Sequence, residues 1–249
     1  MKTPFLRPLL SVTVLLGLTQ CATTNAPRLL PATAAQSETL DSTVQLQIFL
    51  DARHFGPGVV DGRTGEFTTK ALDLYRKAKG LSSDASPDVS GISPYTTYTI
   101  RADDLSVLGT MGESPAEIAK QARQPYTSLK EMLAERFHTT QAFVAQLNPG
   151  VALDSLTAGA AITVPNVKQP FRADAFPSAY PKRSVVAGVT RHIEVSLQAR
   201  MLQVLDGGQL VAAFPITPGS SDHPAPVGEW KVMGAVPWPW YRYDEGVLE

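Results

Sequence analysis

The sequence of 249 residues has little of several features that define common protein classes. It contains a single cysteine, Cys21, so no disulfide can form within the chain. It has no excess of either charge, because 22 lysines and arginines stand against 23 aspartates and glutamates. That balance argues against a broad phosphate-neutralising surface and hence against nucleic acid as a partner. Its apolar run at Leu9–Leu18 is shorter than the ~20 residues that a membrane-spanning helix needs.

Hydrophobic residues make up 43% of the chain, which is enough to form a buried core. The 20 prolines exceed the usual share of ~5% and gather between segments rather than inside them. This pattern predicts several small modules joined by stiff connectors.

The first 21 residues combine a basic start, a short apolar core and a processing site, as secretory signal peptides do. The ending Leu18-Thr19-Gln20-Cys21 resembles a bacterial lipobox, although Gln20 stands where a small residue is usual. The resemblance implies lipid attachment at Cys21 and a place in the bacterial cell envelope, lipid-anchored and facing the periplasm. The alternative is a buried N-terminal helix with a chance cysteine. Residues 22–40, rich in alanine, threonine and proline, predict a flexible tether.

A small helical module is predicted over residues 41–82. Apolar residues recur at helical spacing from Asp41, and Phe55–Gly58 stops this first helix. A tight loop at Asp61–Gly65 leads into a second helix that ends near Gly80. The inward stripe of the second helix consists of Phe67, Ala71, Tyr75 and Ala78.

This module resembles the helical type of peptidoglycan-binding domain. The matching pieces are Leu46-Gln47-x-x-Leu50, Pro57-Gly58, Asp61-Gly62, Gly65 and Ala71-Leu72. The family's Phe-Gln pair in the second helix is Tyr75-Arg76 here. The resemblance implies binding to the cell wall, whereas the alternative is that Asp61 and the glycines serve only as turn residues.

A second module is predicted over residues 96–167. It starts with a strand near Tyr98–Ile100, and Ser114–Glu117 has the spacing of a capping box with proline at the first helical position. Ser128–Glu131 repeats the capping box, and Thr140 caps the next helix. The inward residues of these two helices are Leu129, Met132, Leu133, Phe137, Phe143, Val144 and Leu147, and a strand at Ala161–Pro165 closes the module.

Residues 126–167 resemble the LysM glycan-binding module. The matching pieces are Leu133-Ala134-Glu135-Arg136-Phe137, Leu147-Asn148-Pro149-Gly150 and the segment from Ala158 to Pro165. The resemblance implies a βααβ fold and a groove for N-acetylated sugars, with Asn148, Pro149 and Gly150 as peptidoglycan-contacting residues. A long insertion, Arg101 to Pro125, separates the first strand from the helices and could cover the groove. The alternative is a chance helical hairpin.

A proline-rich linker at 168–184 precedes a segment of period two at 185–249. Apolar residues alternate at 193–197, 202–204 and 210–216, with a hairpin signal at Asp206–Gly208, and again at Trp230 and Val232. Three or four antiparallel strands with one buried face are therefore expected.

The β-segment resembles the start of the L,D-transpeptidase (YkuD-type) catalytic domain. The matching pieces are Ile193–Leu197, Leu202–Gly208, Phe214–Gly219 and Pro224–Trp230, with Ala225-Pro226-Val227-Gly228 in place of the family's Thr-Pro-x-Gly. The family attacks a peptidoglycan stem peptide with a cysteine in a Ser-x-Gly-Cys stretch downstream of a histidine, and passes the acyl group to an amine. The sequence lacks that stretch, so no catalytic residue is assigned. The chain is expected to be either the front part of a longer enzyme or the product of a truncated frame.

Other chemistry finds little support in the sequence. The histidines at 54, 138, 192 and 223 have no second ligand at metal-binding spacing, so no metal and no cofactor is expected. Ser220, Ser221, Asp222 and His223 are adjacent in one stretch, which rarely gives triad geometry. The aromatic residues Trp238, Trp240, Tyr241 and Tyr243 are either an aromatic platform for sugars or part of a β-domain core.

Together these observations predict a multidomain α+β chain: a helical wall-binding module, a LysM-like βααβ module and the first strands of a mostly-β catalytic domain. The leading hypothesis is a cell-wall L,D-transpeptidase that cross-links or remodels stem peptides through a cysteine acyl-enzyme. The alternative is a non-catalytic peptidoglycan-binding envelope lipoprotein. Under both hypotheses the partners are peptidoglycan glycan strands and stem peptides, with the membrane reached through an N-terminal lipid.

Overall fold

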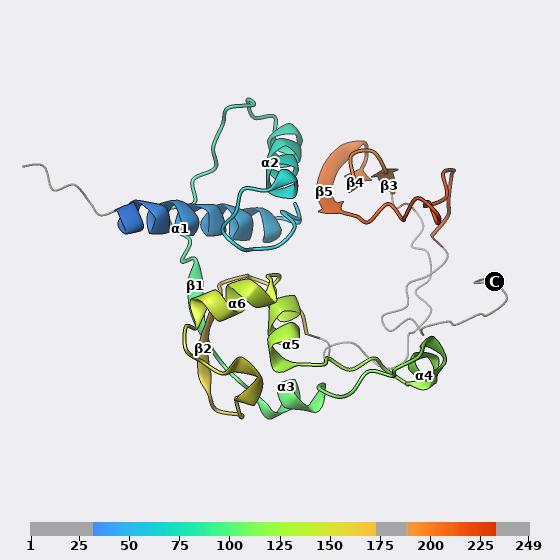
Figure 1. Cartoon of the computed structure of the whole chain (residues 1–249). Coiled ribbons are helices and arrows are strands. Elements are labelled where there is room, and N and C mark those ends of the chain that lie inside the picture. Colours follow the sequence, from blue (N-terminus) through green and yellow to red (C-terminus); the bar gives the residue numbers. More distant parts are fainter. Residues whose placement is uncertain (1–31, 173–187, 189, 233–249) are drawn as a thin grey trace, which may run out of the picture.

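The structure of the chain is a computed structural model that describes residues 32–172, 188 and 190–232. It contains helices and two small antiparallel sheets, so the α+β class is confirmed (Figure 1). The signal peptide with Cys21, the first part of the tether, most of the linker and the aromatic residues 238–243 lie outside the described residues. Among the described helices, none is both long and apolar enough to cross a membrane.

The first helix, α1 (Ala32–Asp51), begins earlier than Asp41, where the sequence pattern places its start. No glycine or proline interrupts this stretch and alanines are frequent in its first turns, so the helix continues through what the composition predicts as tether. The second helix, α2 (Glu66–Lys79), ends as predicted, because Gly80 adopts the left-handed conformation at its C-terminus with φ of 64°.

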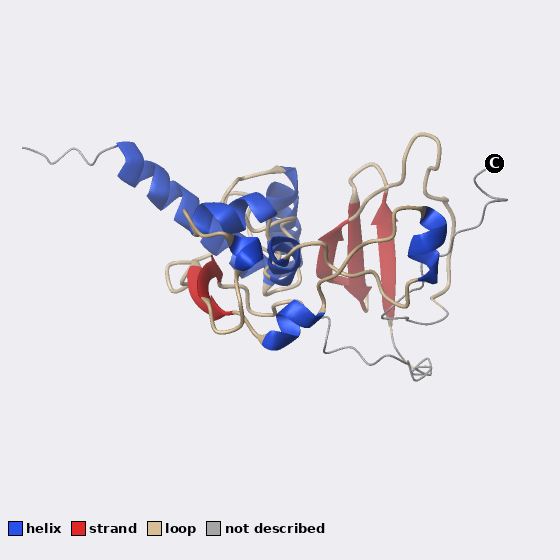
Figure 2. Cartoon of the chain, turned by 60° about the horizontal axis from the view of Figure 1, so that its bottom comes forward, coloured by secondary structure: helices blue, strands red, loops and turns tan. Residues whose placement is uncertain are grey.

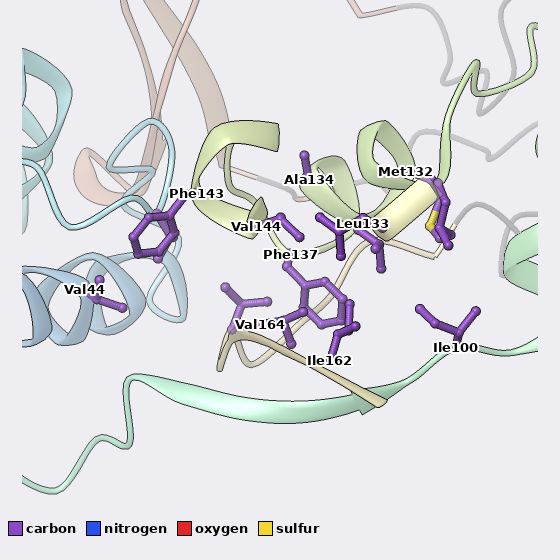
Figure 3. Close-up of a cluster of buried hydrophobic side chains, with 14 of the residues drawn as sticks. Val44, Ile100, Met132, Leu133, Ala134, Phe137, Phe143, Val144, Ile162 and Val164 are labelled. Carbon is purple, nitrogen blue, oxygen red and sulfur yellow. The ribbon is translucent and has the colours of Figure 1, made fainter. Parts of the chain in front are cut away.

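The second module has the predicted order of strand, two helices and strand. Strands β1 (Tyr95–Thr99) and β2 (Ala161–Pro165) pair antiparallel, with Tyr98 opposite Ile162. Helices α5 (Leu129–Arg136) and α6 (Gln141–Leu147) pack over this pair, and a short 3₁₀ helix, η1 (Leu153–Ser155), follows. Figure 3 shows the shared core, which includes the buried side chains Leu133, Phe137, Phe143, Val144, Ile162 and Val164.

The predicted helix caps are confirmed in most details. Thr140 accepts a hydrogen bond from the Phe143 N–H, and Ser114 forms both bonds of its capping box with Glu117. Ser128 likewise accepts from the Glu131 N–H, but the Glu131 carboxylate bonds Thr127 instead of returning to Ser128.

The insertion between β1 and α5 forms two short helices, α3 (Ala102–Ser106) and α4 (Pro115–Lys120). Helix α3 contacts α5, whereas α4 projects away from the βααβ core (Figure 1).

The C-terminal sheet has the order β3–β4–β5, formed by β3 (Arg191–Ser196), β4 (Met201–Asp206) and β5 (Gln209–Pro215). The predicted hairpin is confirmed, since Gly207 and Gly208 link β4 to β5 with positive φ. The prediction of three or four strands is confirmed at the lower number, because within the described residues 229–232 form no strand. Alternation of apolar and polar residues indicates only that a segment has two different faces. It does not show that a neighbouring strand is there to pair with it.

Helix α1 lies between two cores and belongs to both. Val44 and Ile48 are buried with the βααβ module, whereas Phe49 and Leu50 are buried with α2 and the β4–β5 strands. The view in Figure 2 shows the β1–β2 pair on one side, the β3–β5 sheet on the other and helices between them. The sequence predicts separate modules joined by stiff connectors. In the structure, α1 instead contributes buried residues to both cores and so joins them.

Candidate functional site

The loop at Asp61–Gly65 is built around the buried side chain of Gln47. Its Oε1 accepts hydrogen bonds from the N–H groups of Asp61 at 3.0 Å and Gly62 at 2.9 Å. Its Nε2 donates to the Arg63 carbonyl at 3.1 Å and to the Thr68 hydroxyl at 3.2 Å. The motif that resembles a peptidoglycan-binding domain therefore shapes this loop, and residues 63–65 remain exposed.

The three predicted glycan-contacting residues differ in exposure. Asn148 is buried, and its Nδ2 donates to the carbonyls of Val144 and Thr163, both at 2.8 Å. Its Oδ1 accepts from the Thr163 N–H at 2.8 Å, so this side chain joins α6 to β2. Pro149 and Gly150 are exposed beside it. Asn148 therefore holds the turn in position, and of the three predicted residues only Pro149 and Gly150 are exposed at the surface.

A cavity of about 230 Å³ lies between the insertion and α5. The insertion and the residue after it supply its apolar and aromatic walls, from Val107, Met111, Pro125 and Tyr126. Helix α5 supplies two carboxylates, Glu131 and Glu135, and Arg123 and Gln124 complete the lining. None of the predicted site residues lines it, and sequence reasoning missed it because the pattern of the insertion gives no sign of where it folds back.

The cavity is anionic along α5. The Glu131 carboxylate accepts from the hydroxyl of Thr127 at 2.6 Å and from its N–H at 2.8 Å, and these bonds hold the pKa of Glu131 below its usual range. Burial, with the Glu135 carboxylate adding to it, raises the pKa of Tyr126 well above its usual range. At neutral pH Glu131 is therefore ionised and the Tyr126 hydroxyl is protonated.

A buried ion pair anchors the insertion against α5. Asp104 is fully buried, pairs with Arg136, and accepts hydrogen bonds from the Tyr98 hydroxyl at 2.6 Å and the Arg101 N–H at 2.8 Å. Burial alone would raise the pKa of Asp104, but these bonds and the Arg136 charge lower it. The Arg136 Nε, also buried, has no hydrogen-bond partner among the described residues.

The polar loop after β5 does not form a hydrolase triad. The backbone N–H of His223, rather than its imidazole, bonds the Ser220 hydroxyl at 3.0 Å, and Ser221 donates to Asp222 at 3.2 Å. All four side chains are exposed. The described residues contain no cysteine, and they hold no group of three or more His, Cys, Asp or Glu that could bind a metal.

Comparison with known proteins finds a match for the part of the chain that contains the β3–β5 sheet. Residues 190–248 match the family model of the L,D-transpeptidase catalytic domain, YkuD. A protein of Bacillus licheniformis named "Putative L,D-transpeptidase YkuD" is 29% identical over 109 residues, which are 44% of this chain and 56% of that protein. The chain thus spans little more than half the length of the curated relative that it matches.

The family match includes β3, β4, β5 and the loop with His223, so the resemblance expected for 185–249 is confirmed at the level of the domain type. The 109 matched residues are more than 190–248 contains, so the likeness to the Bacillus licheniformis protein includes residues outside that segment.

Proposed function

We propose that the protein acts as an L,D-transpeptidase of the bacterial cell wall. The observation that carries this proposal is the family match at 190–248, which contains the three-stranded sheet β3–β4–β5. The name of the Bacillus licheniformis relative supports the same activity. The substrates are peptidoglycan stem peptides, and the reaction cross-links or remodels them.

The proposed chemistry is acyl transfer through a cysteine. A thiolate attacks the stem-peptide carbonyl, a nearby imidazole favours the thiolate, and backbone N–H groups stabilise the oxyanion of the tetrahedral intermediate. Collapse of this intermediate breaks the peptide C–N bond, and the amine released from that bond takes up a proton and leaves, so the acyl group remains on sulfur as a thioester. The amine of a second stem peptide then attacks the thioester, which forms the new amide bond and regenerates the thiol. The described residues include no thiol, so their part is to form the scaffold of the domain and to hold the wall.

The N-terminal parts supply the proposed wall contact. Glycan strands bind at two exposed places, the loop at 63–65 and the turn at Pro149 and Gly150. The buried side chains of Gln47 and Asn148 hold these two segments in place through hydrogen bonds to the backbone. An acyl group on Cys21 would keep the protein at the membrane facing the periplasm. Linked binding of this kind raises the local concentration of wall substrate around the catalytic part.

The activity is tested on the native protein purified from the cell envelope, with stem peptides as substrate and cross-linked muropeptides followed by chromatography and mass spectrometry. We expect cross-linked products, and we expect the thiol reagent iodoacetamide to abolish them. Products that persist after complete alkylation would overturn the cysteine mechanism.

A second candidate is a non-catalytic peptidoglycan-binding lipoprotein. It is favoured by the cysteine content, because the single cysteine of this sequence lies in the lipobox-like stretch. Sedimentation of the 249-residue chain with purified peptidoglycan, together with an absence of cross-linked products from the native protein, would select this candidate.

A further inference from the structure

The β3–β4–β5 sheet has two faces, and among the described residues the helical module covers one of them. On the covered face, Met201 and Ala213 are buried in one cluster with apolar residues of α1 and α2. Helix α2 lies beside β5 (Figure 1). Successive residues of a strand point to opposite faces, so the neighbours of Met201 and Ala213 lie on the other side of the sheet, which we call the outer face.

The outer face is apolar across all three strands. The register pairs Ile193 with Val204, and it pairs Leu202 with both Val195 and Phe214. The apolar residues of this face, two from each strand, are Ile193, Val195, Leu202, Val204, Ala212 and Phe214. Ile193 is 50% exposed, Val195 53% and Phe214 39%. Adjoining exposed apolar side chains of this kind mark a surface that binds a partner.

Polar groups border the outer face at one end. Arg191 and Asp206 are paired in the register and form an ion pair at 2.9 Å. The exposed apolar surface is also concentrated in this part of the protein, because most of the exposed large hydrophobic side chains among the described residues lie within 190–232. An apolar patch with a polar border is typical of an interaction surface.

The continuation of the same chain has the composition to cover this face. Residues 233–248 follow Val232 and lie outside the described part of the chain. Their apolar and aromatic residues include Met233, Val236, Trp238, Trp240, Tyr241, Tyr243, Val247 and Leu248. The family match at 190–248 includes both the sheet and this segment. The two are therefore expected to share one hydrophobic core.

The length of the segment is also sufficient. Residues 233–248 can span at most about 55 Å when fully extended. The outer face measures roughly 10 Å across its three strands and about 20 Å along strands of six residues. Because the segment is covalently attached to the sheet, its effective concentration there is on the order of millimolar. A second copy of the chain at micromolar concentration competes poorly with it for the same face.

We propose that residues 233–248 dock on the outer face of the sheet, with the indole rings of Trp238 and Trp240 against Ile193 and Val195. The sheet is then the middle layer between the helical module and this segment. Of the two interpretations of the aromatic residues at 238–243, the proposal selects the core of a β-domain over a platform for sugars. It uses the family match and is independent of the transpeptidase activity.

The test uses the full 249-residue chain with labelled methyl groups and measures nuclear Overhauser effects between indole protons and methyl protons. We expect contacts from the indoles of Trp238 or Trp240 to the methyl groups of Ile193 or Val195. The methyl groups of Val151, which is 42% exposed on the turn after α6, should show none. Single Trp→Phe variants at 238 and 240 assign the indole signals.

A pair of valine variants tests the same contact through stability. Val195→Asp would place a carboxylate beneath the docked segment, so we expect the Tm to fall by about 5 °C or more. Val151→Asp changes a valine of similar exposure and should lower the Tm by no more than about 2 °C. If Val195→Asp fails to fold, the indole contacts in the parent chain decide the question.

Three outcomes would each overturn the proposal. The first is the absence of indole contacts with the outer face, or equal Tm losses for the two valine variants. The second is a dimer in sedimentation velocity that Val195→Asp converts to a monomer, which would assign the face to a second copy. The third is a chain with both Trp238→Ala and Trp240→Ala that keeps its Tm and loses sedimentation with peptidoglycan, which would assign the indoles to sugars. None of these measurements depends on cross-linking.

Discussion

Phe55 and Ala213 lie side by side in a parallel bridge, where the turn after α1 joins the outer edge of β5. The Gly56 N–H donates to the Ala213 carbonyl at 2.7 Å, and the Ala213 N–H donates to the His54 carbonyl at 2.9 Å. The helical module thus pairs with the edge of β5 at Ala213 and satisfies backbone groups that this edge strand would otherwise leave unpaired there. The helical module and the β3–β5 sheet therefore stabilise each other.

The first prediction concerns the aromatic anchor of this contact. Phe55 is buried and meets Tyr75 edge-on, with ring centroids 5.6 Å apart. We expect Phe55→Ala to lower the free energy of unfolding by about 3–5 kcal/mol, since it leaves a cavity between α2 and β5. Urea unfolding followed by circular dichroism measures the loss, and amide exchange at Ala213 should become faster.

The control for this change is Leu81→Ala, which shortens a side chain that is 45% exposed just after α2. We expect it to cost less than about 1 kcal/mol. Similar losses for the two variants would show that the contact with β5 contributes little.

The second prediction concerns Asn148, which joins α6 to β2 through three hydrogen bonds. Asn148→Ala leaves the buried Val144 carbonyl and the part-buried backbone groups of Thr163 without their partner, so we expect a loss of about 2–3 kcal/mol in unfolding free energy. The exposed neighbour Gln146→Ala should change it by no more than about 0.5 kcal/mol. If Asn148 instead acts mainly at the surface, its replacement would weaken sedimentation with peptidoglycan and leave the urea midpoint unchanged.

Local sequence patterns predict much of this fold because they encode local geometry. The helical stripe of α2, the Thr140 cap and the Gly207–Gly208 hairpin each follow from residues within a few positions of one another. The resemblance of the β-segment to a catalytic domain was likewise carried by short contiguous pieces.

What the sequence did not reveal depends on contacts between distant segments. Asp104 stands in a short polar stretch, and nothing near it in the chain indicates its pairing with Arg136. The cavity at Glu131 and Glu135 exists only because the insertion folds back on α5. The double burial of α1 escaped prediction for the same reason, since periodicity shows that a helix has an apolar face but does not identify the partner.

The third prediction compares two glycines that share a left-handed backbone but differ in surroundings. Gly62 has φ of 75°, and a Cβ there would lie 2.5 Å from Leu40 Cδ1. Gly80 has φ of 64° with nothing within 4 Å of such a Cβ. We expect Gly80→Ala to cost about 1–2 kcal/mol of unfolding free energy from backbone strain alone. Gly62→Ala should cost more in the same urea titration. Besides the backbone strain, the added methyl group would clash with the Leu40 side chain of α1, which must shift to make room. Equal costs would mean that the loop adjusts freely.

The last prediction concerns acid stability and the buried Asp104. Its pKa is lower in the folded chain than in the unfolded chain, so the unfolded state takes up a proton more readily as the pH falls. The stability that Asp104 contributes is thus fully present above its unfolded pKa of about 4 and is lost as the pH drops through the lower folded value. Asp104→Asn leaves Arg136 buried without its counter-charge, and we expect it to cost about 3–5 kcal/mol at pH 7.

The same variant should also lose stability less steeply than the parent chain between pH 4 and pH 2, because the titrating carboxylate is gone. Urea midpoints over that range, with Asp103→Asn as the exposed neighbour for comparison, measure both effects. An Asp104→Asn chain that is as stable as the parent at pH 7 and follows the same acid profile would show that the insertion is held by its apolar contacts. The anchoring of the cavity beside α5 would then have to be assigned to Val107 and Tyr126, which line it.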